Sequence, residues 1–463
     1  MDYRLIITAS ALNRLLEEPQ AQRSFFAVHP AGLCRLPDRL DWLLHDVQTP
    51  TDVEAVPRVI VVRAENHADL HRALTAQVER AAFEAPTIWL ALGTGPAAGC
   101  LGAVCRPGQH IEPVSSITVV GPGMPQLGVR PNNPNEAIYE EPRRIGDHGQ
   151  QESQFLSENV WSRTIGALGE STWRRLAALH VAVVGCGRSG SLVANALVRI
   201  GVRELTLVDP DLLEAHNVGE MEGVRLSQVG LPKVAALARF LQEYAPRVSD
   251  RAHPCKIHAV ADSVLSLNGL VKVKRADAVF CCVDNPAARL ATSFIATVYL
   301  RPLFDLGAAV LRHAGANRDP QASALPRSVS QAEVRVGADV RLVLPGQRCL
   351  LCFGGIPEID RARTALLETG TSVQTTPLEW RQQRTGSLRS LNGLAAQLAL
   401  RLLEELVATR LQESTWLCLD GDPTGIPLLR RANGKQEGRC ALCVLAGRGD
   451  AAIRELRPLL ERL

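Results

Sequence analysis

Several features that define other protein classes are missing from this chain of 463 residues. No apolar run approaches the ~20 residues that a membrane helix needs, and the N-terminal segment lacks the basic-then-apolar order of a signal peptide. The net charge is only +3, too small to indicate binding to nucleic acid or to an anionic membrane. No internal repeat is present. These absences favour a cytoplasmic protein with neither nucleic acid nor a membrane as partner.

The composition is that of a folded protein with more than one domain. A hydrophobic content of 46% with 21% charged residues provides ample core, and the length predicts two or three domains. Two strand-like runs, 58–64 and 87–93, flank a segment with helical spacing at 67–83. A Pro- and Gly-rich stretch beginning at Gly121 then leads into a polar segment. We predict a smaller N-terminal α/β accessory domain of unknown role at 1–150, with no catalytic constellation, followed by a second domain at 151–463.

The twelve cysteines do not indicate a disulfide framework, because the chain is long and carries no secretion signal. Four of them form two tight pairs, Cys349-x-x-Cys352 and Cys440-x-x-Cys443, separated by 87 residues. Four thiolates in this arrangement suit a tetrahedral Zn²⁺ ion. Such a site has no open position, so its role is structural. Seven others in or beside apolar stretches are predicted to be buried thiols: Cys34, Cys100, Cys105, Cys255, Cys281, Cys282 and Cys418.

From residue 155 onward, short apolar strands alternate with helical segments, which predicts a mostly parallel sheet covered on both faces. Gly185-x-Gly187-x-x-Gly190 follows the strand VAVVG and opens a helix. These glycines permit a tight turn, the approach of phosphates and close helix–strand packing. Asp209 ends the next strand, at a position suited to a ribose-binding carboxylate. The motif predicts a nucleotide site but leaves NAD, FAD and ATP open.

The following residues separate these nucleotides. Asp209-x-Asp211, then Asn217, then Gly230-x-x-Lys233 resemble the pattern of the ThiF/MoeB/ubiquitin-activating family. The resemblance implies a Rossmann-like ThiF-type adenylation domain that uses ATP, with Asn217 and Lys233 near the phosphates. A solvated charge at a helix start is the alternative for Lys233.

One position departs from the family pattern. The family's arginine falls on Glu220 here, so part of the triphosphate clamp is missing or replaced. Arg225 is close enough in sequence to substitute.

Two further segments fit the resemblance. Asp284 follows the apolar run AVFCCV and suits Mg²⁺, while Arg289, five residues later, either contacts the nucleotide or positions the loop by pairing with a carboxylate. Arg163 lies in a segment whose family counterpart reaches the active site of the partner subunit. The resemblance therefore implies a homodimer, with an exposed structural arginine as the alternative. Family members also carry the wide spacing of the two cysteine pairs.

The family's crossover segment corresponds to residues of about 360–390, just before a long apolar helix with a stripe through Leu391, Leu394, Ala395, Leu398, Leu402 and Leu406. In relatives of the autophagy type, a thioester-forming cysteine stands where Ser387 stands here. Either Ser387 replaces a native cysteine, or the enzyme stops at the adenylate; an ordinary helix-capping serine is the third interpretation.

The resemblance implies an enzyme that adenylates the C-terminus of a ubiquitin-like protein with ATP and Mg²⁺. With a cysteine at position 387 it would carry that protein as a thioester for a conjugating enzyme. The layout is most like the activating enzymes of bacterial ubiquitination-like operons. Adenylation of a sulfur carrier and an inactive scaffold are the alternatives, and Glu220 and the absent crossover cysteine favour the scaffold.

Overall fold

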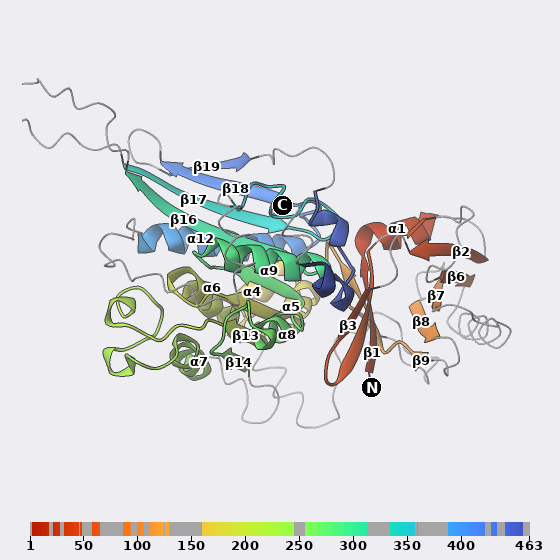
Figure 1. Cartoon of the computed structure of the whole chain (residues 1–463), viewed down its shortest axis with the longest axis horizontal. Helices are drawn as coiled ribbons and strands as arrows, with labels where there is room; N and C mark the ends of the chain where they lie inside the picture. Colours follow the sequence, from red (N-terminus) through yellow and green to blue (C-terminus); the bar gives the residue numbers. More distant parts are fainter. Residues whose placement is uncertain are drawn as a thin grey trace, which may run out of the picture.

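A computed structural model gives the structure of the chain (Figure 1). It describes residues 2–17, 22–27, 32–45, 47–48, 58–64, 87–93, 100–105, 112–124, 126–128, 160–244, 255–312, 334–356, 359, 388–421, 427–432 and 440–456. The predicted helix at 67–83, the predicted boundary near residue 150 and most of the crossover segment lie outside these residues. The division into two domains therefore stays a prediction.

The largest sheet has eight strands in the order β14-β13-β12-β15-β16-β17-β18-β19. The first five of these run parallel: β14 (Lys256–Val260), β13 (Glu204–Val208), β12 (His180–Val184), β15 (Ala278–Cys281) and β16 (Leu303–Arg312). All five residues of β12 and all four of β15 are buried, because helices cover both faces of a parallel sheet. The predicted α/β fold with a mostly parallel sheet is confirmed.

Helices connect these strands and supply the cover. They are α6 (Arg188–Arg199), α7 (Lys233–Tyr244), α8 (Leu267–Val273) and α9 (Pro286–Val298). The Asn285 side chain accepts a hydrogen bond of 2.8 Å from the Ala287 N–H, and Pro286 occupies the first helical turn, so the sequence itself fixes where α9 begins. Two helices precede the sheet, α4 (Ser162–Leu168) and α5 (Glu170–Ala178).

The other three strands extend the sheet in antiparallel fashion: β17 (Val334–Val343), β18 (Thr415–Gly421) and β19 (Pro427–Ala432). The predicted long helix is α12 (Arg389–Val407), which shares a hydrophobic core with α6 and β17. Its predicted stripe is wrong at Leu394, which is 46% exposed. Ala399 and Leu403 are buried instead. Because successive residues of a helix lie about 100° apart around its axis, the buried face of α12 is rotated relative to the predicted stripe.

The N-terminal residues form two smaller sheets and helix α1 (Ala9–Glu17). The five-stranded sheet, in the order β11-β10-β1-β4-β3, contains β1 (Asp2–Thr8), β3 (Gly32–Arg35), β4 (Arg39–Leu44), β10 (Ser116–Val120) and β11 (Gln126–Gly128). The six-stranded sheet, in the order β5-β2-β6-β7-β8-β9, contains β5 (Val47–Gln48), β2 (Gln22–Ala27), β6 (Arg58–Ala64), β7 (Thr87–Gly93), β8 (Cys100–Cys105) and β9 (Glu112–Pro113). The two predicted strands are confirmed as β6 and β7, which pair in parallel.

The five-stranded sheet is joined to the main sheet through buried charges and the C-terminal segment. Arg4 of β1 pairs with Asp277, which precedes β15, at 3.0 Å. The C-terminal segment includes η3 (Cys443–Leu445) and η4 (Asp450–Glu455), and lies between the two parts (Figure 1, dark blue). There, Asp450 accepts hydrogen bonds from the Arg35 backbone N–H and the Lys274 ammonium, both at 2.9 Å. Both ends of the chain thus contribute to one interface.

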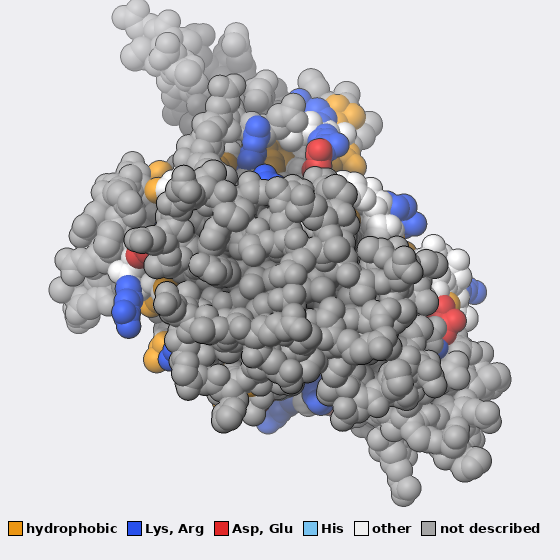
Figure 2. All heavy atoms as spheres, turned by 90° about the vertical axis from the view of Figure 1, so that its right-hand side faces the viewer, with side chains coloured by type: hydrophobic (Ala, Val, Ile, Leu, Met, Phe, Trp, Pro, Cys, Tyr) orange, Lys and Arg blue, Asp and Glu red, His pale blue; other side chains and the backbone are white. Residues whose placement is uncertain are grey.

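Two properties describe the surface and the helices as a whole. On the face carrying the N-terminal sheets, charged side chains of both signs are interspersed among the described residues (Figure 2). Within the described part of the chain, no helix is both long enough and apolar enough to span a membrane.

Candidate nucleotide-binding site and four-cysteine cluster

The glycine motif forms the turn between β12 and α6. Gly185 has a φ of +85°, a conformation open to glycine, and a Cβ there would lie 2.8 Å from the Cys282 carbonyl oxygen. A Cβ on Gly190 would lie 1.8 Å from the Gly185 carbonyl oxygen, so helix and turn pack together only with glycine. A Cβ on Gly187 would meet nothing within 4 Å. Open space at the start of α6 is therefore free for a ligand, and the helix N-terminus there favours an anion.

Asp209 braces this turn. Its Oδ2 accepts a hydrogen bond of 2.7 Å from the Cys186 backbone N–H, and its Oδ1 accepts one of 2.9 Å from the Asp211 N–H. Burial raises the pKa of the Asp209 carboxyl. The carboxylate thus holds the turn and the end of β13 together, while the predicted ribose contact stays a prediction.

The loop after β13 meets the start of α7. Lys233, the first residue of α7, directs its ammonium to the Asp211 carboxylate at 2.7 Å, and its backbone N–H donates to the Asp211 carbonyl at 3.0 Å. Buried Asn217 accepts a hydrogen bond of 2.9 Å from the Glu214 N–H and contacts His216 through its Nδ2 at 3.0 Å. The structure brings Asp211 and Lys233 together, whereas the described contacts of Asn217 are within its own turn.

Asp284 lies beside the glycine turn. The residue is exposed, between β15 and α9, and the N–H of Cys282, two residues earlier, donates to the Val184 carbonyl at 2.8 Å. Arg289 has a different environment: its guanidinium pairs with fully buried Asp305 at 3.1 Å and donates to the Val283 carbonyl at 2.8 Å. These contacts agree with the loop-positioning role considered for Arg289, and a direct nucleotide contact stays a prediction.

Glu220, which stands where the family has arginine, forms an ion pair with Arg188 at the first position of α6. The Glu220 carbonyl also accepts a hydrogen bond of 2.9 Å from Arg389 at the start of α12, and Arg389 reaches Glu222 at 2.5 Å. Within the described residues, Nε and Nη1 of Arg188 are buried without a hydrogen-bond partner. Burial, followed by the Arg389 charge, lowers the pKa of Arg188. Two arginines therefore surround Glu220.

Sequence reasoning missed Arg188 and Arg389, and proposed Arg225 instead. Arg225 precedes the 3₁₀ turn η2 (Leu226–Gln228), and its backbone N–H donates a hydrogen bond of 2.8 Å to the Gln228 side chain. One signal in the sequence pointed to Arg188: an arginine stands inside the glycine motif of a chain whose loop carries a glutamate in place of an arginine.

Arg163 is exposed on α4. Trp161, two residues earlier, donates its indole N–H to the Arg199 carbonyl at 2.8 Å, and its ring lies 5.3 Å from that of Trp173. Because Arg199 ends α6, these contacts hold the start of α4 near the end of α6 remote from the glycine turn, roughly 18 Å away along the helix. A contact with the nucleotide of a partner subunit stays a prediction.

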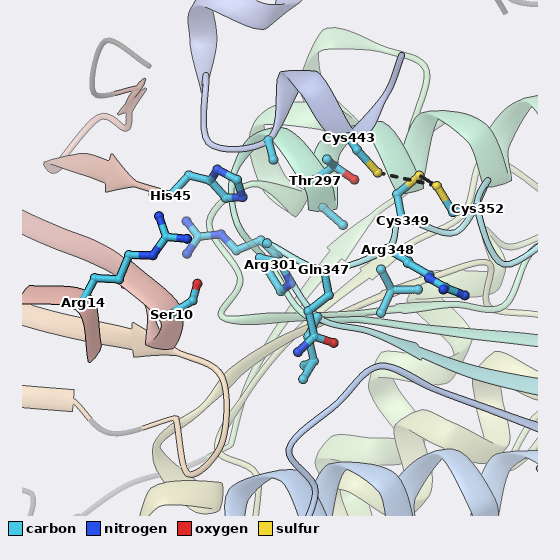
Figure 3. Close-up of a pocket in the computed structure, with 16 residues that line it drawn as sticks. Ser10, Arg14, His45, Thr297, Arg301, Gln347, Arg348, Cys349, Cys352 and Cys443 are labelled. Carbon is cyan, nitrogen blue, oxygen red and sulfur yellow. Dashed lines mark hydrogen bonds between the residues drawn. The ribbon is translucent and has the colours of Figure 1, made fainter. Parts of the chain in front are cut away.

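The two cysteine pairs come together in one cluster. The sulfur of Cys349 lies 3.7 Å from that of Cys352 and 3.3 Å from that of Cys440, and Cys443 lies 3.6 Å from Cys352 and 3.5 Å from Cys440. Figure 3 shows three of these sulfurs side by side. A tetrahedral Zn²⁺ with Zn–S bonds of about 2.3 Å requires S···S separations of about 3.8 Å. The cluster therefore fits a metal ion of this kind.

The thiols themselves are suited to metal binding. Three of the four are buried, and the Cys443 backbone N–H donates to the Cys440 sulfur at 3.4 Å. Of the thiols predicted to be buried, Cys34 and Cys281 are buried and Cys255, Cys282 and Cys418 are half-buried. Ser387 lies outside the described residues.

The sequence profile of the ThiF family matches residues 161–401, just over half of the chain. The chain belongs to the ThiF family. The matched residues include the glycine turn, the ends of β13 and β15, and most of α12.

Among curated relatives, this ThiF-family chain is 37% identical over 97 residues to tRNA threonylcarbamoyladenosine dehydratase 2 of Saccharomyces cerevisiae, which covers 21% of this chain and 22% of the relative. It is 36% identical over 124 residues to ubiquitin-like modifier-activating enzyme 5 of Drosophila mojavensis (26% and 31% covered) and 31% identical over 172 residues to the Mus musculus enzyme of the same name (34% and 42% covered). The chain thus spans less than half the length of these relatives. A solved structure of E. coli MccB with ATP is 17% identical, covering 65% of this chain and 82% of that one, with a TM-score of 0.44.

Proposed function

We propose that this ThiF-family protein uses ATP to adenylate the C-terminal carboxylate of a ubiquitin-like protein. The observation that carries the proposal is the convergence of the glycine turn, the Asp211–Lys233 pair and Asp284 at the carboxyl ends of β12, β13 and β15. Open α/β sheets bind ligands at this edge. The relatives named for modifier activation support the class of substrate.

The reaction requires a nucleotide held with its α-phosphate open to attack. A carboxylate oxygen of the substrate forms a bond to the α-phosphorus, the bond from that phosphorus to the β-bridging oxygen breaks, and pyrophosphate leaves with the electron pair. The N–H groups at the start of α6 face the phosphates, and Lys233 exchanges its contact with Asp211 for one with a phosphate oxygen. Such preorganised charges stabilise the transition state more than the ground state.

Asp284 is the carboxylate that would hold Mg²⁺. It is exposed at the site edge rather than paired in the core, and a hard cation of this kind takes one or two protein carboxylates. When bound, Mg²⁺ neutralises phosphate charge. Asp284 itself contributes an oxygen ligand whose position is fixed by the start of α9.

Arg188 and Arg389 supply the positive charge that the family's arginine supplies elsewhere. Arg188 lies on the first turn of α6, and its buried Nε and Nη1 have no hydrogen-bond partner within the described residues. Phosphate oxygens are the partners that such a guanidinium fits. On this view Glu220 holds Arg188 in place until nucleotide binds.

The four-cysteine cluster holds a structural Zn²⁺ ion in this proposal, because four thiolates leave the metal no open position. Transfer to a conjugating enzyme requires a thiol near the adenylate, and position 387 is where the resemblance places it. With Ser387 the proposed enzyme stops at the adenylate. Homodimerisation, with Arg163 reaching the partner's site, completes the proposal.

ATP–pyrophosphate exchange in the presence of a candidate modifier tests the adenylation step. We expect exchange that depends on Mg²⁺ and on the free modifier C-terminus. The Asp284→Ala variant should lose exchange by about 10²–10³-fold with an unchanged melting temperature, since the side chain is exposed. Exchange at the wild-type rate in Asp284→Ala would remove Asp284 from the site. If the wild-type protein shows no exchange with any candidate modifier, the scaffold alternative is favoured.

The Ser387→Cys variant tests the thioester step separately. We expect it to form an adduct with the modifier that disappears on adding reductant, because thiols exchange with thioesters. Wild-type Ser387 should give no adduct that reductant removes. If Ser387→Cys shows normal exchange but no reductant-sensitive adduct, the thioester step is contradicted and the enzyme stops at the adenylate.

A further inference from the structure

A cavity of about 240 Å³ lies between the N-terminal part of the chain and the four-cysteine cluster. Its walls come from α1 (Arg14), the residue after β4 (His45), the loop between α9 and β16 (Arg301) and the segment that links β17 to Cys349 (Arg348). Figure 3 shows Arg14, His45 and Arg301 pointing toward a common space. None of the lining residues belongs to the glycine turn, so this cavity is separate from the nucleotide site.

The lining is cationic. Among the described residues that line the cavity are three arginines, a histidine and three cysteines of the four-cysteine cluster, but no aspartate or glutamate. Arg14 and Arg348 are exposed at the mouth, whereas Arg301 is fully buried at the base. The positive charges come from three elements far apart in the sequence, and folding brings them to one place.

Arg301 belongs to a buried network with more positive than negative charge. The Asp41 carboxylate, which is fully buried, pairs with Arg4 at 3.2 Å, Arg39 at 2.9 Å and Arg301 at 3.3 Å. Asp277 supplies the second carboxylate, paired with Arg4 at 3.0 Å. Three guanidinium groups thus share two carboxylates. Burying uncompensated charge is costly, so an added anion would stabilise this network.

The shortage of acceptors is visible at a single atom. Arg301 donates through Nη2 to Asp41 and, at 2.9 Å, to the Lys274 carbonyl, but its buried Nε has no hydrogen-bond partner within the described residues. Burial, and then the charge of Arg4, lower the pKa of Arg301. The neighbouring Lys274 has its own counter-ion in Asp450 at 2.9 Å and adds no net charge. Arg301, which lines the cavity, therefore retains capacity for one more acceptor.

We propose that this cavity binds a small oxyanion, a phosphate or a carboxylate group, between Arg14, Arg301 and Arg348. Guanidinium groups bind both oxyanions through paired N–H donors. The volume lies below the ~300 Å³ at which pockets for drug-sized ligands begin, which favours a small anion over a nucleotide. Because α1 and the Cys349 segment both line the cavity, the bound anion also joins the N-terminal part of the chain to the four-cysteine lobe.

Isothermal titration calorimetry of the full chain with inorganic phosphate and, separately, with acetate tests the proposal, at constant ionic strength set with chloride. We expect at least one of the two anions to bind. The Arg14→Gln and Arg348→Gln variants, which change exposed residues outside the buried network, should bind it about tenfold more weakly. Arg401→Gln, an exposed arginine of α12 outside the cavity, is the matched control and should bind as wild type does.

The two anions distinguish the chemistry of the ligand. Binding of phosphate alone assigns a phosphate group, binding of acetate alone assigns a carboxylate, and binding of both assigns an oxyanion site without preference. If phosphate bound at the glycine turn instead, the Arg14→Gln and Arg348→Gln substitutions would not change its affinity. Equal affinity in wild type and both cavity variants, or no binding of either anion by wild type, would overturn the proposal and leave the adenylation proposal untouched.

Discussion

At the scale of single residues, two charged side chains distinguish this chain from the family pattern, one in the glycine motif and one in the loop after β13. Glu220 takes the place of an arginine, and Arg188 stands within the glycine motif and pairs with it. A lone glutamate beside phosphates would repel them. The pair instead leaves a half-buried guanidinium, with Nε and Nη1 buried, at the start of α6, so the local charge balance can still favour phosphate.

Replacement of Arg188 tests this substitution. We predict that Arg188→Ala lowers kcat/KM for ATP–pyrophosphate exchange by about 10²-fold, the loss typical when one preorganised donor is removed. Arg199→Ala at the other end of α6 is the control and should keep wild-type exchange. The double variant Arg188→Ala with Glu220→Arg returns the family arrangement and should recover most of the lost activity. An unaffected Arg188→Ala enzyme would show that Arg188 serves only to pair with Glu220.

At the scale of secondary-structure elements, the sequence predicted the Rossmann-like half well. The strand β12 and the helix α6 that the glycine motif opens lie where the sequence predicted them. In the N-terminal part, β6 and β7 lie where apolar runs placed them. Long periodic segments carry such a strong signal because helices and buried strands each impose one spacing. The N-terminal sheets were largely missed, since strands as short as β5 and β9, with two residues each, are stabilised by distant partners that local pattern does not reveal.

The same limit applies to the site. The glycine turn follows from its spacing, and the four-cysteine site from the two tight pairs together with the family resemblance; the structure brings each set together. The roles of Arg188, Arg389 and Asp305 depend on which side chains meet after folding. Arg389 and Glu220, for example, are in contact although they are 169 positions apart in the sequence. The rotated face of α12 has the same cause: Leu394 fits an apolar stripe, but the position of α6 and β17 decides which face is covered.

The four-cysteine cluster gives a prediction at this scale, because it fastens the segment after β17 to η3. Native mass spectrometry should detect one zinc ion per chain, and Cys352→Ser should lose it and lower the melting temperature, since binding of a structural metal contributes folding free energy directly. Cys418→Ser, a half-buried thiol outside the cluster, should retain the metal. A metal-free wild-type protein of equal stability would contradict the zinc assignment.

At the scale of the whole molecule, Asp41 of β4 pairs with Arg4 and Arg39 of its own sheet and, across to the main part of the chain, with Arg301. We predict that Asp41→Asn destabilises the protein by about 3–5 kcal/mol, the cost of leaving buried charges without their partner. Asp38→Asn breaks a pair with Arg275 in which the Asp38 side chain is 59% exposed, and should cost less than about 1 kcal/mol. Chemical denaturation of the two variants gives the comparison, and equal effects would contradict it.

The buried network also predicts how stability depends on pH. Burial raises the pKa of the Asp41 carboxyl, but Arg4, Arg301 and Arg39 lower it by more, so its pKa lies below the usual value. Burial also raises the pKa of Asp277, but Arg4 and Arg301 lower it, so its pKa too lies below the usual value. A lowered folded-state pKa contributes stability that is fully present above the unfolded value of about 3.9 and is lost as the pH falls below it. Denaturation midpoints measured from pH 7 to pH 3 should therefore drop steeply below about pH 4 in wild type, and less steeply in Asp41→Asn.

Complementation between two inactive variants tests whether one molecule completes the site of another. If Arg163 acts on a partner subunit, Arg163→Ala and Asp284→Ala are each inactive as homodimers. In a mixed dimer, the Arg163→Ala subunit keeps Asp284 and receives Arg163 from its partner, so one of the two sites is intact. Random exchange of subunits at equal concentrations makes half of the dimers mixed, and a two-fold dimer has two sites, so the mixture should recover about a quarter of wild-type exchange. If Arg163 served its own chain, the same subunit would lack it, and the mixture would stay as inactive as either variant alone.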